Sequence, residues 1–228
     1  MDNRISDAGH NRGIDAGILA APRRSLFGRL VSVAVVGFSG LAAMPSRASA
    51  APVADGPAWP GKLKGRHRQV VDGTWINDGA ALEYAHNFLA TNPSPGAALV
   101  VVILRGGALP IALNNTIWEK YKIGEGFKIT DPETKAPAVK NPFLHPKPGV
   151  LRSDEAAVDR LLAAGAVFGA CDVALHGQSK RLAGNAGVSA EEAAKEWAAN
   201  VIPGITIIPA GVWGVNRAQE AGCTYCGG

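Results

Sequence analysis

The stretch AALVVVIL at residues 97–104 decides the fold class, because its eight residues are apolar without interruption. A strand with one solvated face alternates apolar and polar residues, whereas a strand buried on both faces of a parallel sheet is continuously apolar. The sequence NPSPG at residues 92–96 breaks the chain just before it, so the apolar run begins a separate element. We therefore expect a central strand of a parallel sheet at residues 97–104.

Strand and helix patterns alternate along the rest of the chain. Further strands are expected at residues 69–71, 166–171 and 205–209, with an edge strand from Cys223. Helices are expected at residues 77–90, 109–121, 153–164, 172–182 and 212–221. Asn77 and Asp78 are expected to cap the first of them, and Ser189 to Glu192 form a capping box that opens one more. This alternation predicts an α/β domain with a mainly parallel sheet. The segment at residues 122–150 holds five prolines, and a loop of this length is usually functional or packs against a neighbour.

Residues 1–50 carry the pattern of an export signal. Arg23 and Arg24 precede an apolar run at residues 30–44, and Ala48-Ser49-Ala50 supplies the small residues after which a signal peptidase cuts. The arginine pair indicates the twin-arginine route to the periplasm. An uncleaved membrane anchor is the alternative, but it needs about 20 mostly apolar residues, and this run is shorter and interrupted by Gly and Ser. We expect cleavage, a disordered extension ahead of the arginines, and no membrane span in the mature chain.

The net charge of the chain comes mostly from this signal. The 228 residues hold 23 Lys and Arg against 19 Asp and Glu, a net charge of +4. Residues 1–50 contain six Arg and three Asp, so 17 basic and 16 acidic residues remain, a net charge of +1. Nucleic-acid binding needs a clustered basic surface, which the mature sequence lacks, so no nucleic-acid partner is expected. After a Pro- and Gly-rich leader at 51–65, residues 66–228 suit a single domain.

Cys171 is the candidate reactive residue. It falls where a predicted parallel strand ends and a helix begins, the edge at which open α/β sheets bind ligands. The N–H groups at the start of that helix favour a thiolate, the nucleophilic form of cysteine. His176, one turn along the helix, could add positive charge when protonated. Arg105, just past the central strand, could hold an anion or be an ordinary strand-end charge. Because free cysteines are often buried, an inert structural thiol is the alternative for Cys171.

Cys223 and Cys226 form a CxxC pair after the last expected helix. Thiols tend to pair in an oxidising compartment, and we favour a local disulfide that fastens this segment. Two alternatives stay open: a redox dithiol that resolves a persulfide or disulfide on Cys171, and half of a zinc site. A c-type haem site needs a histidine at position 227, which is glycine, and no cofactor is expected.

The sequence around Cys171, GAVFGACDVAL from Gly165, resembles the GVxFxxCxxxL segment of DsrE-like proteins, the sulfur-relay family. The stretch PGITIIPAGVWGVNRAQEAG at residues 203–222 is similar to that family's PGVxxVPAGVxxLxxxQxxG ending. Residues 98–121 resemble its strand-plus-helix opening. The resemblance covers about residues 66–226, nearly the whole mature chain.

The resemblance implies a three-layer α/β/α domain with a five-stranded, mainly parallel sheet that assembles into homo-oligomers. It also implies that Cys171 matches the cysteine that accepts and passes on a persulfide sulfur. The chain departs from the family pattern in its long segment at residues 122–150 and in an insertion at residues 183–201. Its CxxC also stands where relatives commonly have an aromatic residue.

These observations favour one function over two alternatives. The favoured one is an exported, periplasmic protein that handles sulfane sulfur through Cys171, as a persulfide carrier or a sulfurtransferase-like enzyme, with a sulfur donor and acceptor thiols as partners. The second is a non-catalytic binding or assembly module in which Cys171 is inert. The third is a metal-binding protein that uses Cys223 and Cys226, with Cys171 or His176. Access to Cys171 separates the first two.

Overall fold

The computed structural model describes residues 63–228, which form a five-stranded sheet with helices around it. The strands are β1 (His67–Gly73), β2 (Ala98–Leu104), β3 (Val167–Cys171), β4 (Ile205–Ile208) and β5 (Thr224–Gly227). Their order across the sheet is β4-β3-β2-β1-β5, and each neighbouring pair is parallel. The predicted α/β class with a five-stranded parallel sheet is confirmed. The expected signal at 1–50 and most of the leader at 51–65 lie outside the described residues.

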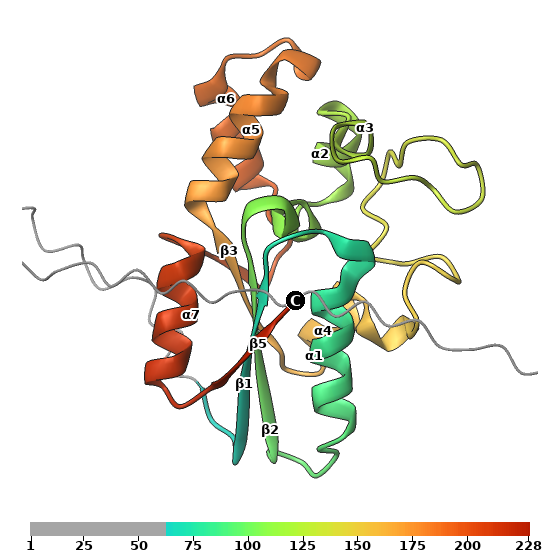
Figure 1. Ribbon diagram of the computed structural model, residues 1–228. Helices are drawn as coiled ribbons and strands as arrows, with labels where there is room; N and C mark the ends of the chain where they lie inside the picture. The colour runs from blue at the N-terminus through green and yellow to red at the C-terminus, as the bar shows by residue number, and fades with distance from the viewer. Residues whose placement is uncertain (1–62) are drawn as a thin grey trace, which may run out of the picture. The chain divides into compact units, whose positions relative to one another are not determined.

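Helices cover both faces of the sheet. They are α1 (Ala80–Ala90), α2 (Asn115–Lys120), α3 (Ile123–Phe127), α4 (Val158–Ala163), α5 (Asp172–Ala186), α6 (Ala190–Ala199) and α7 (Gly211–Glu220), with 3-10 helices η2 (Asn77–Gly79), η3 (Gly106–Ala112) and η4 (Asp154–Ala156). Figure 1 shows α1 on one side of the strands and α7 on the other, while α5 and α6 stand beyond the end of β3. This arrangement is a three-layer α/β/α fold. No helix in residues 63–228 is long and apolar enough to cross a membrane.

The alternation of side chains along β2 builds two separate cores. Val100, Val102 and Leu104 join the larger cluster with α1 and the helices that follow, whereas Val101 and Ile103 join a smaller cluster with α7. All five side chains are fully buried. The uninterrupted apolar sequence of this strand is thus explained by burial on both faces, as expected for a central parallel strand.

The expected helix at residues 109–121 is wrong in extent. Two shorter elements replace it, η3 with Pro110 inside and α2, which starts only after Asn114. The side chain of Asn114 accepts hydrogen bonds from the N–H groups of Thr116 and Ile117, so it caps α2 and separates it from η3. The segment at residues 122–150 includes α3 and is otherwise irregular, in agreement with its prolines.

Residues 183–201, the stretch expected to be an insertion, form the end of α5 and all of α6, and Glu196 joins α6 to α2. Lys120 Nζ lies 2.7 Å from both carboxylate oxygens of Glu196, and the Tyr121 hydroxyl donates a 2.5 Å hydrogen bond to one of them. These contacts, first with Lys120 and then with Tyr121, hold the pKa of Glu196 below its ordinary value of 4.5. The ion pair therefore helps to fasten α6 to the rest of the domain.

Glu196→Gln is expected to make the domain less sensitive to acid. Because the pKa of Glu196 is lower in the folded than in the unfolded chain, its contacts stabilise the fold above pH 4.5, and this stabilisation is lost as the pH falls through the folded-state value. The Tm of Glu196→Gln should therefore fall less than that of the wild type between about pH 7 and pH 3. Glu191→Gln, which removes an exposed pair with Lys195, is the control. Equal acid sensitivity of Glu196→Gln and wild type would contradict this prediction.

Candidate functional site

Cys171 lies at the junction of β3 and α5, as the sequence predicted, and the structure makes it the N-cap of α5. Its Sγ accepts a hydrogen bond from the N–H of Ala174 at 3.3 Å, the position that a serine or aspartate oxygen usually takes at a helix start. The residue is only 5 % exposed. A partner for Cys171 must therefore approach along a narrow path or wait for a local opening.

Arg105 lies beside Cys171 because of the strand register. Leu104 of β2 pairs with Ala170 of β3, so Arg105 and Cys171, the residues that follow them, are neighbours at the carboxyl end of the sheet. The hydrogen bond to Asp72 is the largest cause of the raised pKa of Arg105, and an electrostatic interaction with Cys171 is the smallest. The structure thus brings together two of the residues that the sequence singled out.

A buried aspartate, which sequence reasoning missed, holds Arg105 in place. Asp72, at the end of β1, is 3 % exposed and accepts two hydrogen bonds from Arg105, from Nε at 2.7 Å and from Nη2 at 2.8 Å. The Tyr225 hydroxyl donates to the same carboxylate at 3.1 Å, and this bond is the largest cause of the raised pKa of Tyr225. Asp72, Arg105 and Tyr225 form what we call the arginine cluster. The signal for it was an acidic residue directly after the apolar pair Val70 and Val71 of the expected strand.

Helix α7 also confines Arg105. A Cβ at Gly211 would lie 2.4 Å from Arg105 Cδ and 2.6 Å from its Cβ, far closer than carbon atoms approach. The side chain of Arg105 therefore runs along the first turn of α7 in space that only a glycine leaves open. Packing and hydrogen bonds together fix the guanidinium, which is partly exposed at the carboxyl edge of the sheet.

His176 is not brought to Cys171. Its Nδ1 lies 3.0 Å from the carbonyl oxygen of Asp172 and 3.3 Å from that residue's carboxylate, one turn back on α5. The ring is exposed, and its polar contacts within residues 63–228 are those with Asp172. The structure therefore places His176 on the outer surface of α5 and gives it no direct contact with the thiol.

The tail cysteines do not form the expected local disulfide, and all three cysteines are free thiols. Cys223 is buried in the cluster under α7, where burial raises the pKa of its thiol, whereas Cys226 packs against the larger cluster on the other face. An extended chain rises about 3.3 Å per residue, so their Cα atoms stand roughly 10 Å apart. A disulfide requires less than about 7 Å. The strand geometry of β5 is therefore incompatible with this bridge.

The tail cysteines also lie far from Cys171. Strands β2 and β1 separate β3 from β5, and neighbouring strands are about 4.8 Å apart. That spacing puts Cys226 roughly 14 Å from the line of β3, too far to resolve a persulfide on Cys171. Within the described part of the chain, no group of three or more His, Cys, Asp or Glu side chains is arranged to hold a metal ion.

Three apolar side chains stand exposed on elements that meet at this carboxyl edge. Trp75 follows β1, Val173 is the second residue of α5, and Val212 is the second residue of α7. Each exposes about two thirds of its surface, at 65–67 %. When several large apolar side chains at this exposure lie on elements that converge, they indicate a surface that contacts a partner or a ligand. The carboxyl edge of the sheet therefore combines the buried thiol of Cys171, the guanidinium of Arg105 held by Asp72, and an exposed apolar surface.

Comparison with protein-family models and with curated proteins finds no match for this chain.

Proposed function

We propose that this protein handles sulfane sulfur through Cys171, as a persulfide carrier or a sulfurtransferase-like enzyme. The observation that supports this most is the position of Sγ at the start of α5, where it accepts the Ala174 N–H, with Arg105 beside it. Backbone N–H groups at a helix start and a nearby cation are the features that favour the nucleophilic thiolate. The resemblance of the surrounding sequence to DsrE-like proteins supports the same chemistry.

The reaction needs only sulfur exchange. The Cys171 thiolate attacks the terminal sulfur of a donor such as thiosulfate, the donor's S–S bond breaks, and its electron pair leaves with sulfite. The sulfur remains on Cys171 as a persulfide. An acceptor thiolate then attacks the outer sulfur and releases the Cys171 thiolate, so the two steps together need no oxidant or reductant.

The burial of Cys171 limits the size of the donor. A residue that is 5 % exposed presents a small edge of its sulfur to solvent. Slim donors such as thiosulfate or polysulfide fit this access better than a folded protein thiol does. Export by the twin-arginine route, which carries folded proteins, belongs to the same proposal and would place this chemistry in the periplasm.

Purified protein incubated with thiosulfate or polysulfide is expected to gain about 32 Da, the mass of one sulfur, on a thiolate nucleophile. Intact-mass spectrometry of Cys171→Ala should show no gain. Cys223→Ala and Cys226→Ala are matched controls that remove one thiol each and should keep the adduct. An adduct that persists in Cys171→Ala, or no adduct with any donor, would overturn the proposal.

A binding or assembly module is the second candidate, favoured by the exposed Trp75, Val173 and Val212 beside a buried thiol. In that case Cys171 would resist alkylation until the protein unfolds, and Trp75→Ser would change the solution mass of the assembly. A sulfur adduct on Cys171 with an unchanged assembly mass for Trp75→Ser would exclude this alternative.

A further inference from the structure

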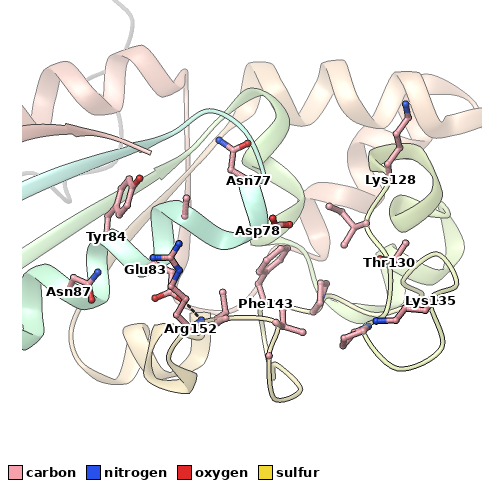
Figure 2. Close-up of a pocket in the computed structure, with 17 residues that line it drawn as sticks. Asn77, Asp78, Glu83, Tyr84, Asn87, Lys128, Thr130, Lys135, Phe143 and Arg152 are labelled. Carbon is pink, nitrogen blue, oxygen red and sulfur yellow. Dashed lines mark hydrogen bonds between the residues drawn. The ribbon is translucent and has the colours of Figure 1, made fainter. Parts of the chain in front are cut away.

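A groove of about 930 Å³ lies between α1 and the irregular segment at residues 122–150 with the two residues that follow it, and neither Cys171 nor Arg105 lines it. Figure 2 shows Lys128 and Lys135 on one wall, facing side chains from the start of α1 and the turn before it. Small-molecule sites typically measure roughly 300–1,000 Å³. The groove is therefore large enough for a ligand of its own.

Three cations line this groove without a partner. Lys128 and Lys135 come from the irregular segment, and Arg152 comes from the stretch that follows it. None of these side chains makes an ion pair with another residue of the described chain. Cationic side chains gathered around one hollow repel each other unless an anion lies between them.

The acidic residues nearby are engaged elsewhere. Asp131 and Glu133 both bind Lys147, at 3.0 and 2.7 Å, and this lysine is not among the lining residues. The backbone N–H of Thr134 and then Lys147 lower the pKa of Asp131 to about 2. Glu83 accepts the backbone N–H groups that follow Leu151, which ties that stretch to α1. Asp78 is left as the unpaired acid on the lining.

The backbone is strained at this groove more than elsewhere in residues 63–228. Within residues 63–228, five non-glycine residues have a left-handed φ. Four of them line the groove, namely Asn77, Asp78, Lys128 and Lys135, at φ of 30, 50, 58 and 59°. A lysine side chain makes this backbone conformation unfavourable, whereas glycine adopts it without strain. Strained residues of this kind gather at ligand sites, where the side chain is needed in that position.

We propose that this groove binds a small anion that carries negative charge at two ends, such as a di- or tricarboxylate or a diphosphate. The two lysines would hold one end and Arg152 the other, because they stand on opposite walls. The side-chain amides of Asn77 and Asn87, which also line the groove, can donate hydrogen bonds to the ligand's oxygens. This site is separate from the proposed sulfur chemistry and does not depend on it.

Titration calorimetry of the purified protein at low salt, with citrate and with pyrophosphate as probes, tests the proposal. We expect saturable binding of at least one probe, weaker binding as salt is added, and no measurable binding of acetate, which has one charge. The stronger of the two probes distinguishes a carboxylate ligand from a phosphate ligand. Absence of saturable binding for both probes would overturn the proposal.

Lysine-to-glycine variants separate the strain from the charge. Lys128→Gly and Lys135→Gly relieve the left-handed backbone, so each should raise the Tm by roughly 2–4 °C. Both variants together should also weaken probe binding by about tenfold. Lys122→Gly is the matched control, because Lys122 also has a left-handed φ, of 50°, but does not line the groove. It should raise the Tm and leave binding unchanged, and equal losses of binding in all three variants would overturn the proposal.

The variant Asp78→Asn tests the sign of the charge on the bound ligand. It keeps the size of the side chain and its tolerance for φ above zero. Removing the unpaired acid should strengthen probe binding by about threefold. Weaker binding of the anionic probe to Asp78→Asn would mean that the carboxylate does not repel the ligand, which would contradict the proposal.

Discussion

Replacing Asp72 by alanine is expected to lower the free energy of unfolding by about 2–3 kcal/mol, because it removes three hydrogen bonds to one buried carboxylate. Losing one partner of a fully buried ion pair costs roughly 3–5 kcal/mol, and the Arg105 side chain, at 32 % exposure, recovers part of this from water. Thermal or urea unfolding of the variant measures the loss.

Two further variants isolate the pair. Tyr225→Phe removes one hydrogen bond and keeps the ring, so it should cost less than about 1 kcal/mol. The double variant Asp72→Ala/Arg105→Met should be less destabilised than the sum of its single variants. Each single variant leaves one partner of the ion pair unpaired, whereas the double variant removes both. Additive losses would show that Asp72 and Arg105 do not stabilise each other.

Gly124→Ala is expected to destabilise the domain by about 3 kcal/mol, at the upper end of typical overpacking. A Cβ at this position of α3 would lie 2.2 Å from the carbonyl oxygen of Ala138 and 2.5 Å from its nitrogen. These are backbone atoms held by a 2.8 Å hydrogen bond from Ala138 N to Ile129 O, so they cannot rotate away as a side chain can. Because Ile129 lines the anion groove, the variant should also lose probe binding.

Two glycine-to-alanine substitutions serve as controls for Gly124. A Cβ at Gly177 of α5 meets nothing within 4 Å, so alanine there should stabilise the helix by roughly 0.5–1 kcal/mol. A Cβ at Gly126 would meet the flexible end of Leu182, at 2.9 Å, and should be tolerated at small cost. If Gly124→Ala unfolds at the same urea concentration as wild type, the close contact with Ala138 does not exist in solution.

The elements of the fold were largely predictable because they depend on local patterns. The apolar run that became β2 and the strand-to-helix junction at Cys171 need only a few consecutive residues to identify. The capping prediction at Ser189 is confirmed, since its hydroxyl accepts the N–H of Glu192 at 3.1 Å. The prediction that Asn77 and Asp78 cap α1 is wrong. Both have a left-handed φ, Gly79 occupies the capping position, and neither side chain bonds the helix.

The parts of the site that sequence reasoning missed depend on contacts between distant residues. Asp72 lies 33 residues from Arg105 and 153 from Tyr225, so their meeting follows from strand order rather than from spacing. The groove has the same origin, because Lys128 and Lys135 reach it only when the irregular segment folds back towards α1. The expected Cys223–Cys226 bridge was wrong because β5 extends the chain, and a CxxC spacing is closed only in a turn or at a helix start.

The position of β5 beside β1 governs when this domain can finish folding on the ribosome. Thr224 Oγ1 donates a hydrogen bond to the carbonyl oxygen of Arg68, and 156 residues of chain separate the two. Translation proceeds at roughly 5–20 residues per second, so β5 is synthesised about 8–30 s after β1. During that interval the edge of β1 is open, and the face that α7 later covers exposes Val70, Val101 and Ile103. An open strand edge next to an apolar face invites pairing with other chains, so the nascent domain would benefit from a chaperone until β5 is in place.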